Sequence, residues 1–144
     1  MMSGIRTLGI REQAAWMRSR NPEFRCDIIE GLLICRGPLK PGPMNATYDA
    51  VIQYRVGTWP KVFVPGGQLR PLEPGGKIPH TYGPDEPCLF YPSRASWRSD
   101  MKLSHTILPW LALWLTFYEM WRVTGEWYGG GISHGQVEEL EPAA

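Results

Sequence analysis

The sequence predicts an α+β fold in which an N-terminal helix precedes a four-stranded antiparallel meander, and a C-terminal helix closes the chain. Three observations predict it. Apolar residues recur at helical spacing near the N-terminus, apolar and polar residues alternate in short runs between residues 24 and 64, and a wide apolar face begins at residue 107. A chain of 144 residues is expected to form a single domain, residues 1–144, of which 132–144 are expected to be a loose tail.

The first segment is predicted to be a helix that ends at Asn21-Pro22, with Ser3 as a candidate cap at its start. Gly4 and Gly9 weaken the first turn, because glycine lowers helix stability. The residues expected to share the core-facing side are Ile5, Leu8, Ile10, Ala15 and Trp16.

Four short strands are expected next. Residues 24–28 and 31–36 form a hairpin with its turn at Glu30-Gly31, and the alternating run 48–56 and the short run 61–65 complete the meander. The proline-rich stretch 37–43 between the second and third strands is expected to be a stiff connection.

Residues 65–98 show no regular periodicity and are rich in proline and glycine, which favours a long functional loop. The C-terminal helix is expected to begin near Pro109, since proline is tolerated only in a first turn, and to stop at Gly125. Two neighbouring stripes give it a wide apolar face suited to covering a sheet: Trp110, Trp114, Phe117 and Trp121, and Ile107, Leu111, Leu115 and Tyr118.

Composition excludes several classes of function. The net charge is +1 with no basic run, so no nucleic-acid partner is expected. The longest apolar run, 107–118, is too short to span a bilayer, and the first twenty residues lack the apolar core of a signal peptide. Three cysteines, an odd number, favour reduced thiols in the cytoplasm, and no Cys or His spacing predicts a metal site.

One cysteine stands out. Cys88 follows a stiff, acidic loop that begins at Pro79-His80, which makes it a candidate nucleophile. The alternative is a small buried hydrophobic residue, the usual state of a free cysteine. The two differ in one requirement: a nucleophile needs a sulfur that solvent can reach, and burial beneath the C-terminal helix would count against it.

The order of these elements and several motifs resemble the ubiquitin-conjugating enzyme fold over residues 24–122. The matching motifs are Gly37-Pro38 with Tyr48, Trp59-Pro60 with Val62-Phe63-Val64, Cys88-Leu89 and Trp97. The family's His-Pro-Asn triplet is absent. Counted back from Cys88, His80 stands where its asparagine would be, Pro79 keeps the proline, and Ile78 replaces the histidine.

A second set of motifs is more similar to the bacterial ubiquitin-conjugating-like proteins that accompany cyclic-oligonucleotide antiphage systems (CBASS). It comprises Pro79-His80 with Cys88-Leu89, Leu108-Pro109-Trp110, Glu119-Met120-Trp121 and 124–127. The resemblance implies an active-site loop at Cys88 that forms a thioester with the C-terminal glycine of a partner. It also implies that the partner is a cGAS/DncV-like nucleotidyltransferase or another ubiquitin-like donor. No cofactor is implied; ATP would be used upstream, with a separate activating enzyme as an open possibility.

Roles for the neighbouring side chains follow from thioester chemistry. His80 could donate a hydrogen bond to the oxyanion, brace the loop or act as a base. The alternative to these catalytic roles is a purely structural hydrogen bond within the loop. Asp85 and Glu86 could orient or deprotonate an attacking lysine, or simply form a solvated turn. Cys26, Cys35 and the tryptophan stripe are expected to be core.

Two other functions remain open from the sequence. A non-catalytic adaptor of the same fold would bind a modifier or partner without chemistry, which the missing asparagine favours. A thiol hydrolase would need a third residue to orient a Cys-His pair, and no such residue stands out.

Overall fold

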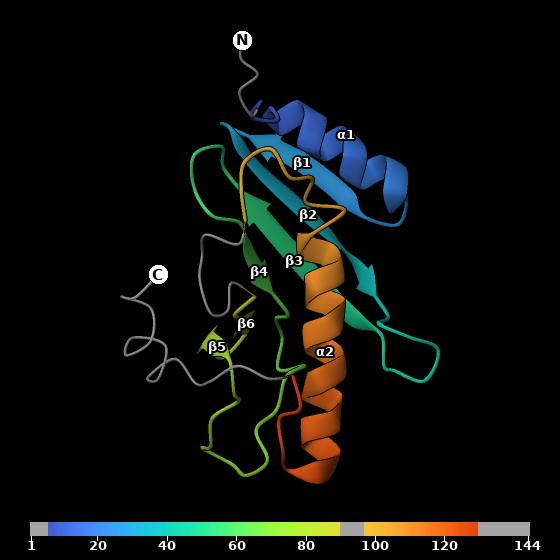
Figure 1. The fold of residues 1–144 in the computed structure, drawn as a ribbon, viewed down its shortest axis with the longest axis vertical. Coiled ribbons are helices and arrows are strands. Elements are labelled where there is room, and N and C mark those ends of the chain that lie inside the picture. Colours follow the sequence, from blue (N-terminus) through green and yellow to red (C-terminus); the bar gives the residue numbers. More distant parts are fainter. Residues whose placement is uncertain (1–5, 90–96, 130–144) are drawn as a thin grey trace.

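The computed structural model describes residues 6–89 and 97–129. Within these ranges the element order is helix, four strands, a short hairpin and a second helix (Figure 1). The bounds are α1 (Ile10–Arg20), β1 (Arg25–Ile29), β2 (Leu32–Leu39), β3 (Tyr48–Tyr54), β4 (Lys61–Phe63), β5 (Thr81–Gly83), β6 (Glu86–Pro87) and α2 (Ile107–Thr124). The predicted α+β class is confirmed, while the predicted tail 132–144 and the candidate cap Ser3 lie outside the described residues.

The four-stranded sheet is antiparallel throughout, in the order β1-β2-β3-β4, as the meander prediction required. Along β3 the alternation is complete, since every second residue from Tyr48 to Tyr54 is buried. Period-two burial is what a sheet with one face on the core imposes on its sequence. The predicted strand 48–56 ends two residues early, because a turn begins after Arg55.

The second strand is longer than predicted. β2 continues through Gly37-Pro38 to Leu39, so the connection expected at 37–43 starts only at Lys40. β1 stops pairing at Arg36, so Pro38 pairs only with β3, opposite Asp49. Its missing N–H therefore falls at a sheet edge, where proline is tolerated.

The start and the buried face of α1 differ from the prediction. Gly9 is the N-cap, and its N–H donates to the Glu12 carboxylate at 2.8 Å, so residues 6–9 are not helical. The buried face comprises Gln13, Ala14 and Met17, whereas Trp16, expected in the core, is 40% exposed. Helical spacing counted from Ile10, where the helix begins, places Gln13, Ala14 and Met17 on one face.

Gln13 joins the two helical regions. Its side-chain amide donates to the Met101 carbonyl at 2.8 Å, and its Oε1 accepts from the Leu103 N–H at 2.9 Å. A fully buried amide needs such partners. Two backbone groups of the turn that leads into α2 are thereby tied to α1.

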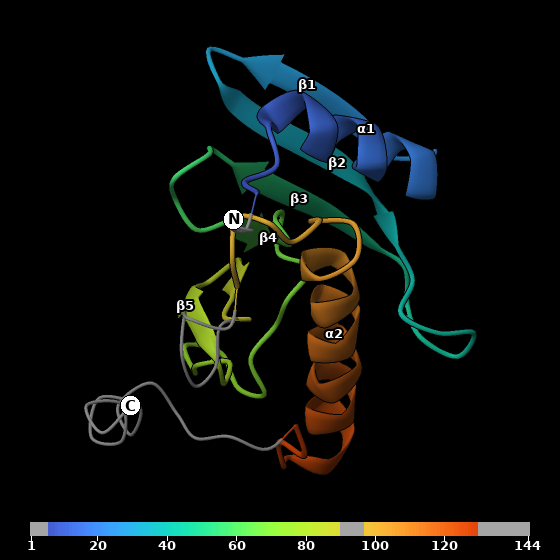
Figure 2. The same ribbon diagram turned by 45° about the horizontal axis from the view of Figure 1, so that its top comes forward.

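α2 begins at the sheet and runs away from it, so its C-terminal half lies beside the loop 65–80 rather than under the strands (Figures 1 and 2). Pro109 lies in the first turn and Gly125 ends the helix in the left-handed region with φ of 81°, as predicted. The arrangement is held by the Arg70 N–H, which donates to the Tyr118 hydroxyl at 2.8 Å, and by Arg122, which donates to the Pro71 carbonyl at 2.6 Å.

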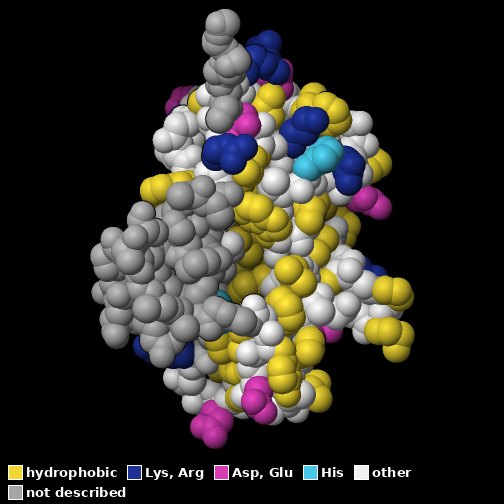
Figure 3. Space-filling model, in the orientation of Figure 1, with side chains coloured by type: hydrophobic (Ala, Val, Ile, Leu, Met, Phe, Trp, Pro, Cys, Tyr) yellow, Lys and Arg dark blue, Asp and Glu magenta, His cyan; other side chains and the backbone are white. Residues whose placement is uncertain are grey.

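Both faces of α2 carry apolar side chains. Hydrophobic side chains gather along the helix on the face seen in Figure 3, whereas Lys and Arg side chains concentrate at the α1 end. Leu113, Met120 and Val123 are exposed on α2 and Ile107, Leu111 and Leu115 are buried. No helix within residues 6–89 and 97–129 is long and apolar enough to cross a membrane.

Candidate functional site

Cys88 lies directly after β6, one residue before the end of the first described range. Its backbone N–H donates to the His80 carbonyl at 2.9 Å, so the β5–β6 hairpin closes with these two residues side by side. The structure thus brings together the two residues that the sequence singled out as a possible pair.

The expectation of an exposed sulfur is wrong for this structure. Cys88 is only 4% exposed. Its amide shares the His80 carbonyl with the Trp114 indole of α2, which donates to that oxygen at 3.0 Å. The thiol therefore belongs to a loop packed next to the aromatic helix.

His80 has an unusual backbone. Its φ is 54°, in the left-handed region that residues with a Cβ seldom adopt. Non-glycine residues held there store conformational strain that the surrounding structure must balance. The contacts that hold His80 include the two hydrogen bonds to its carbonyl and the packing of its ring against Trp127, with centroids 5.1 Å apart.

These rings belong to a larger aromatic cluster at the end of α2. Trp127 follows the Gly125 cap and lies 5.3 Å from Trp114, which in turn stacks on Tyr118 at 5.7 Å with an interplanar angle of 7°. The tryptophans of the α2 stripe were predicted to be core; Trp114 and Trp121 are buried as expected, whereas Trp110 is only partly buried. Its contact with the candidate site was not predicted.

The short hairpin was also missed, because residues 65–98 were expected to lack regular structure. Thr81–Gly83 pairs with Glu86–Pro87 around Pro84-Asp85. The Asp85 carbonyl accepts from the Val64 N–H at 2.8 Å, which attaches the hairpin to the end of β4. Gly83-Pro84-Asp85 is a turn sequence and was the available signal.

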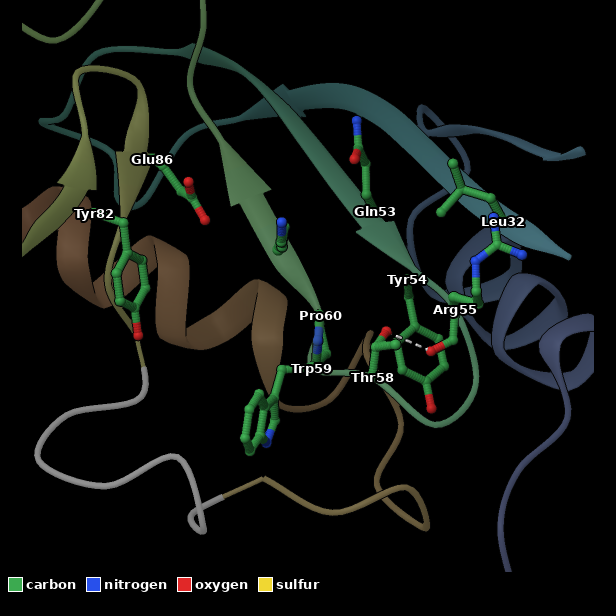
Figure 4. A pocket seen from close by; sticks show the side chains of 10 residues that line it. Leu32, Gln53, Tyr54, Arg55, Thr58, Trp59, Pro60, Tyr82 and Glu86 are labelled. Atoms are coloured by element: carbon green, nitrogen blue, oxygen red, sulfur yellow. Dashed lines mark hydrogen bonds between the residues drawn. The ribbon is translucent and has the colours of Figure 1, made fainter.

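The hairpin separates the two candidate acids. His80 and Asp85 line a groove of about 830 Å³ between β5 and the loop 67–79. Glu86 lines a different groove of about 340 Å³, together with Trp59 and Tyr82. Figure 4 shows Glu86 and Tyr82 on the hairpin at one end of this second groove, Leu32 and Arg55 at the other end, and Trp59 between them. The structure therefore groups Asp85 with His80, and Glu86 with Trp59, while Tyr82 lines both grooves.

Cys26 and Cys35 are core residues, as predicted. They lie opposite each other in the β1–β2 ladder and are 5% and 0% exposed. A hydrogen bond with Cys26 and burial raise the pKa of the Cys35 thiol, so that thiol stays protonated and unreactive.

No group of three or more His, Cys, Asp or Glu side chains in the described part of the chain is arranged to hold a metal ion. The comparisons with known proteins give one family. The family model described as Type II CBASS E2 protein matches residues 13–135, which includes the whole sheet, Cys88 and α2. No curated protein matches the chain.

Proposed function

The chain belongs to the type II CBASS E2 protein family, and we propose that it serves CBASS antiphage defence as a ubiquitin-conjugating-like acyl transferase with Cys88 as its nucleophile. The proposed donor is a protein that ends in glycine, and in a CBASS system we take this donor to be the nucleotidyltransferase. The observation that carries the proposal is the position of Cys88, which ends the hairpin between sheet and α2 with its amide on the His80 carbonyl.

The proposed reaction has two steps. The Cys88 thiolate attacks the carbonyl carbon of the donor's activated C-terminal glycine, and the activating group leaves with the bonding electrons, which forms a thioester. A lysine amine then attacks the thioester carbonyl, the C–S bond breaks, and an isopeptide bond forms while the thiolate is regenerated. The proton lost by the amine needs an acceptor, and Asp85 or His80 supplies it in this proposal.

Burial of Cys88 adds a requirement to this mechanism. A 4% exposed residue cannot meet a protein chain end, so the loop that carries it must open before the donor is loaded. Such an opening protects a charged thioester from water once the loop closes again. It also means that loading depends on a docked donor.

The same burial favours a second candidate. A non-catalytic adaptor of this family would keep Cys88 as a core residue and bind the donor without forming a bond. The absent His-Pro-Asn triplet supports that alternative too, because His80 occupies the position of the asparagine.

A covalent trapping experiment separates the two candidates. The full chain is produced together with its nucleotidyltransferase and an ATP source, and the products are separated without and with a thiol reductant. The proposal expects an adduct that the reductant removes and that Cys88→Ala abolishes, with Cys88→Ser giving a reductant-resistant oxyester. The adaptor candidate expects no covalent product and equal binding by Cys88→Ala in a pull-down assay.

A further inference from the structure

We infer that Trp114 and Trp127 are positioning residues that together hold His80 in its left-handed conformation and thereby fix the loop that carries Cys88. This inference rests on the proposed function for its catalytic meaning. Its structural content, the coupling of two tryptophans on the C-terminal side of the molecule to Cys88, can be tested without any donor.

Trp114 acts through the backbone. Its indole N–H donates to the His80 carbonyl at 3.0 Å, and the Cys88 N–H donates to the same oxygen at 2.9 Å. One carbonyl oxygen has two lone pairs, so it can serve both donors. Rotation of the peptide after His80 moves the acceptor of both bonds at once. The orientation of that peptide therefore couples α2 directly to Cys88.

Trp127 acts through the side chain. Its ring lies 5.1 Å from the His80 imidazole at an interplanar angle of 48°, and 5.3 Å from Trp114 at 56°. Phe117 supports it from α2, with centroids 6.3 Å apart. Trp127 thus lies against both His80 and Trp114, and its ring, packed against the imidazole, limits the rotamers that His80 can adopt.

The left-handed backbone explains why two residues are needed. His80 at φ of 54° is disfavoured on its own, so a relaxed conformation competes with the observed one. Removing either tryptophan shifts the balance toward that relaxed conformation. The expected consequence is a Cys88 amide that loses its acceptor and a thiol that opens more often.

The test uses the full-length chain labelled with ¹⁵N and compares Trp114→Phe, Trp127→Ala and Trp127→Phe with the parent. Trp121→Phe is the matched control, because Trp121 lies on the same helix, is 6% exposed and packs on Tyr118. Three quantities are measured: the Cys88 amide resonance, the alkylation rate of Cys88 by iodoacetamide under native conditions, followed by peptide mass spectrometry, and global stability in denaturant.

Trp114→Phe is expected to shift the Cys88 amide resonance and to raise the alkylation rate about fivefold to tenfold, since one hydrogen bond no longer opposes opening. Trp127→Ala is expected to do the same, and Trp127→Phe to restore most of the parent behaviour because a ring remains. Trp121→Phe is expected to lose comparable stability with an unchanged amide resonance and alkylation rate.

The inference is overturned if Trp114→Phe leaves both Cys88 readings at parent values, or if Trp121→Phe changes them equally, since the tryptophans would then only support the core. Failure of the proposed function looks different. In that case no thioester forms in the trapping experiment, while the amide and alkylation readings still follow Trp114 and Trp127. The two ideas therefore fail separately.

Discussion

The Tyr48 hydroxyl on β3 donates to the Glu119 carboxylate on α2 at 2.6 Å, the shortest of three hydrogen bonds that this carboxylate accepts. The Asn45 amide donates at 2.8 Å and the Ala46 N–H at 3.0 Å, both from the loop between β2 and β3. Glu119 therefore joins the helix to one strand and to one loop. These hydrogen bonds connect α2 to the start of β3 and to the loop before it.

Two tyrosines on the same strand give a matched stability test. Tyr48→Phe removes one donor from a carboxylate that remains half-buried, so it is expected to lower the free energy of unfolding by roughly 1–3 kcal/mol. Tyr54 is 1% exposed, and its hydroxyl has no hydrogen-bond partner among the described residues. Tyr54→Phe should be neutral or slightly stabilising in urea denaturation. Equal losses in the two variants would contradict the assigned role of Glu119.

Glu119 also predicts how stability depends on pH. Burial raises the pKa of its carboxyl, but the hydrogen bonds from Tyr48, Asn45 and Ala46 and the charge of Lys40 outweigh burial, so the pKa falls below its ordinary value of 4.5. The unfolded chain then binds the proton more readily than the folded one. Stability from this group is complete above the unfolded pKa and is lost as pH falls through the folded pKa.

Glu119→Gln removes this titration. The parent is expected to lose stability more steeply than the variant between about pH 5 and pH 3, while above about pH 6 the parent is the more stable of the two. Denaturation midpoints at several pH values measure the difference. Parallel pH profiles would show that the carboxylate carries no linked proton.

Gly37 is required by the ring of Phe24. A Cβ added at Gly37 would lie 2.8 Å from Phe24 Cε1 and closer still to two other ring carbons, so the ring covers the glycine backbone in β2. Gly37→Ala is expected to cost roughly 1–3 kcal/mol through overpacking. Gly83→Ala is the control, because nothing lies within 4 Å of its added Cβ. Adding Phe24→Leu to Gly37→Ala should recover part of the loss, and a loss in Gly83→Ala as large as in Gly37→Ala would refute the contact.

The elements predicted best are those with a long, clear periodicity. Tyr48–Tyr54 alternates strictly, and α2 presents its apolar stripes over five turns with a glycine cap at its end. The predicted start of α1 was wrong, because a weak N-terminal periodicity could not reveal that Gly9 is the N-cap and donates its N–H to the Glu12 carboxylate. The β5–β6 hairpin is too short for any periodicity, and only its turn residues mark it.

The candidate site was predicted in part. His80 and Cys88 were singled out from one loop, but the hydrogen bond between their backbones closes the β5–β6 hairpin, which was not predicted. Trp114 and Trp127 were not assigned to the site, because their contacts with His80 link residues 34 and 47 positions apart and no local pattern reports such distances. A large aromatic residue soon after a Gly125 cap commonly folds back on its helix, which was the one available signal for Trp127.

The core cysteines give a prediction about reactivity. Cys26 and Cys35 should resist alkylation under native conditions, and only unfolding should expose them, since both lie on the buried face of the β1–β2 ladder. Cys35→Ala is expected to cost about 1 kcal/mol, as for removal of one methyl-sized group from a core. Mass spectrometry after timed iodoacetamide treatment measures the rates. Native alkylation of Cys35 as fast as that of Cys88 would contradict its assignment to the core.

The two candidate acids are expected to behave differently in the proposed transfer step, because the hairpin directs them to separate grooves. Asp85 shares its groove with His80, whereas Glu86 shares the other with Trp59. If Asp85 accepts the amine proton, Asp85→Asn should slow the discharge of a Cys88 thioester to free lysine on the order of a hundredfold. Glu86→Gln should leave that rate near the parent value.

The discharge assay also checks where Asp85 acts. The thioester is first formed, the ATP source is then removed, and loss of the adduct is followed after addition of free lysine. Asp85→Asn should still form the adduct, because the first step needs no amine. Hydroxylamine, which is largely unprotonated at neutral pH, should discharge the Asp85→Asn adduct almost as fast as the parent adduct. If the Asp85→Asn adduct also reacts slowly with hydroxylamine, Asp85 does not take the proton. Its role would then be to shape the hairpin, whose Asp85 carbonyl accepts a hydrogen bond from the Val64 N–H.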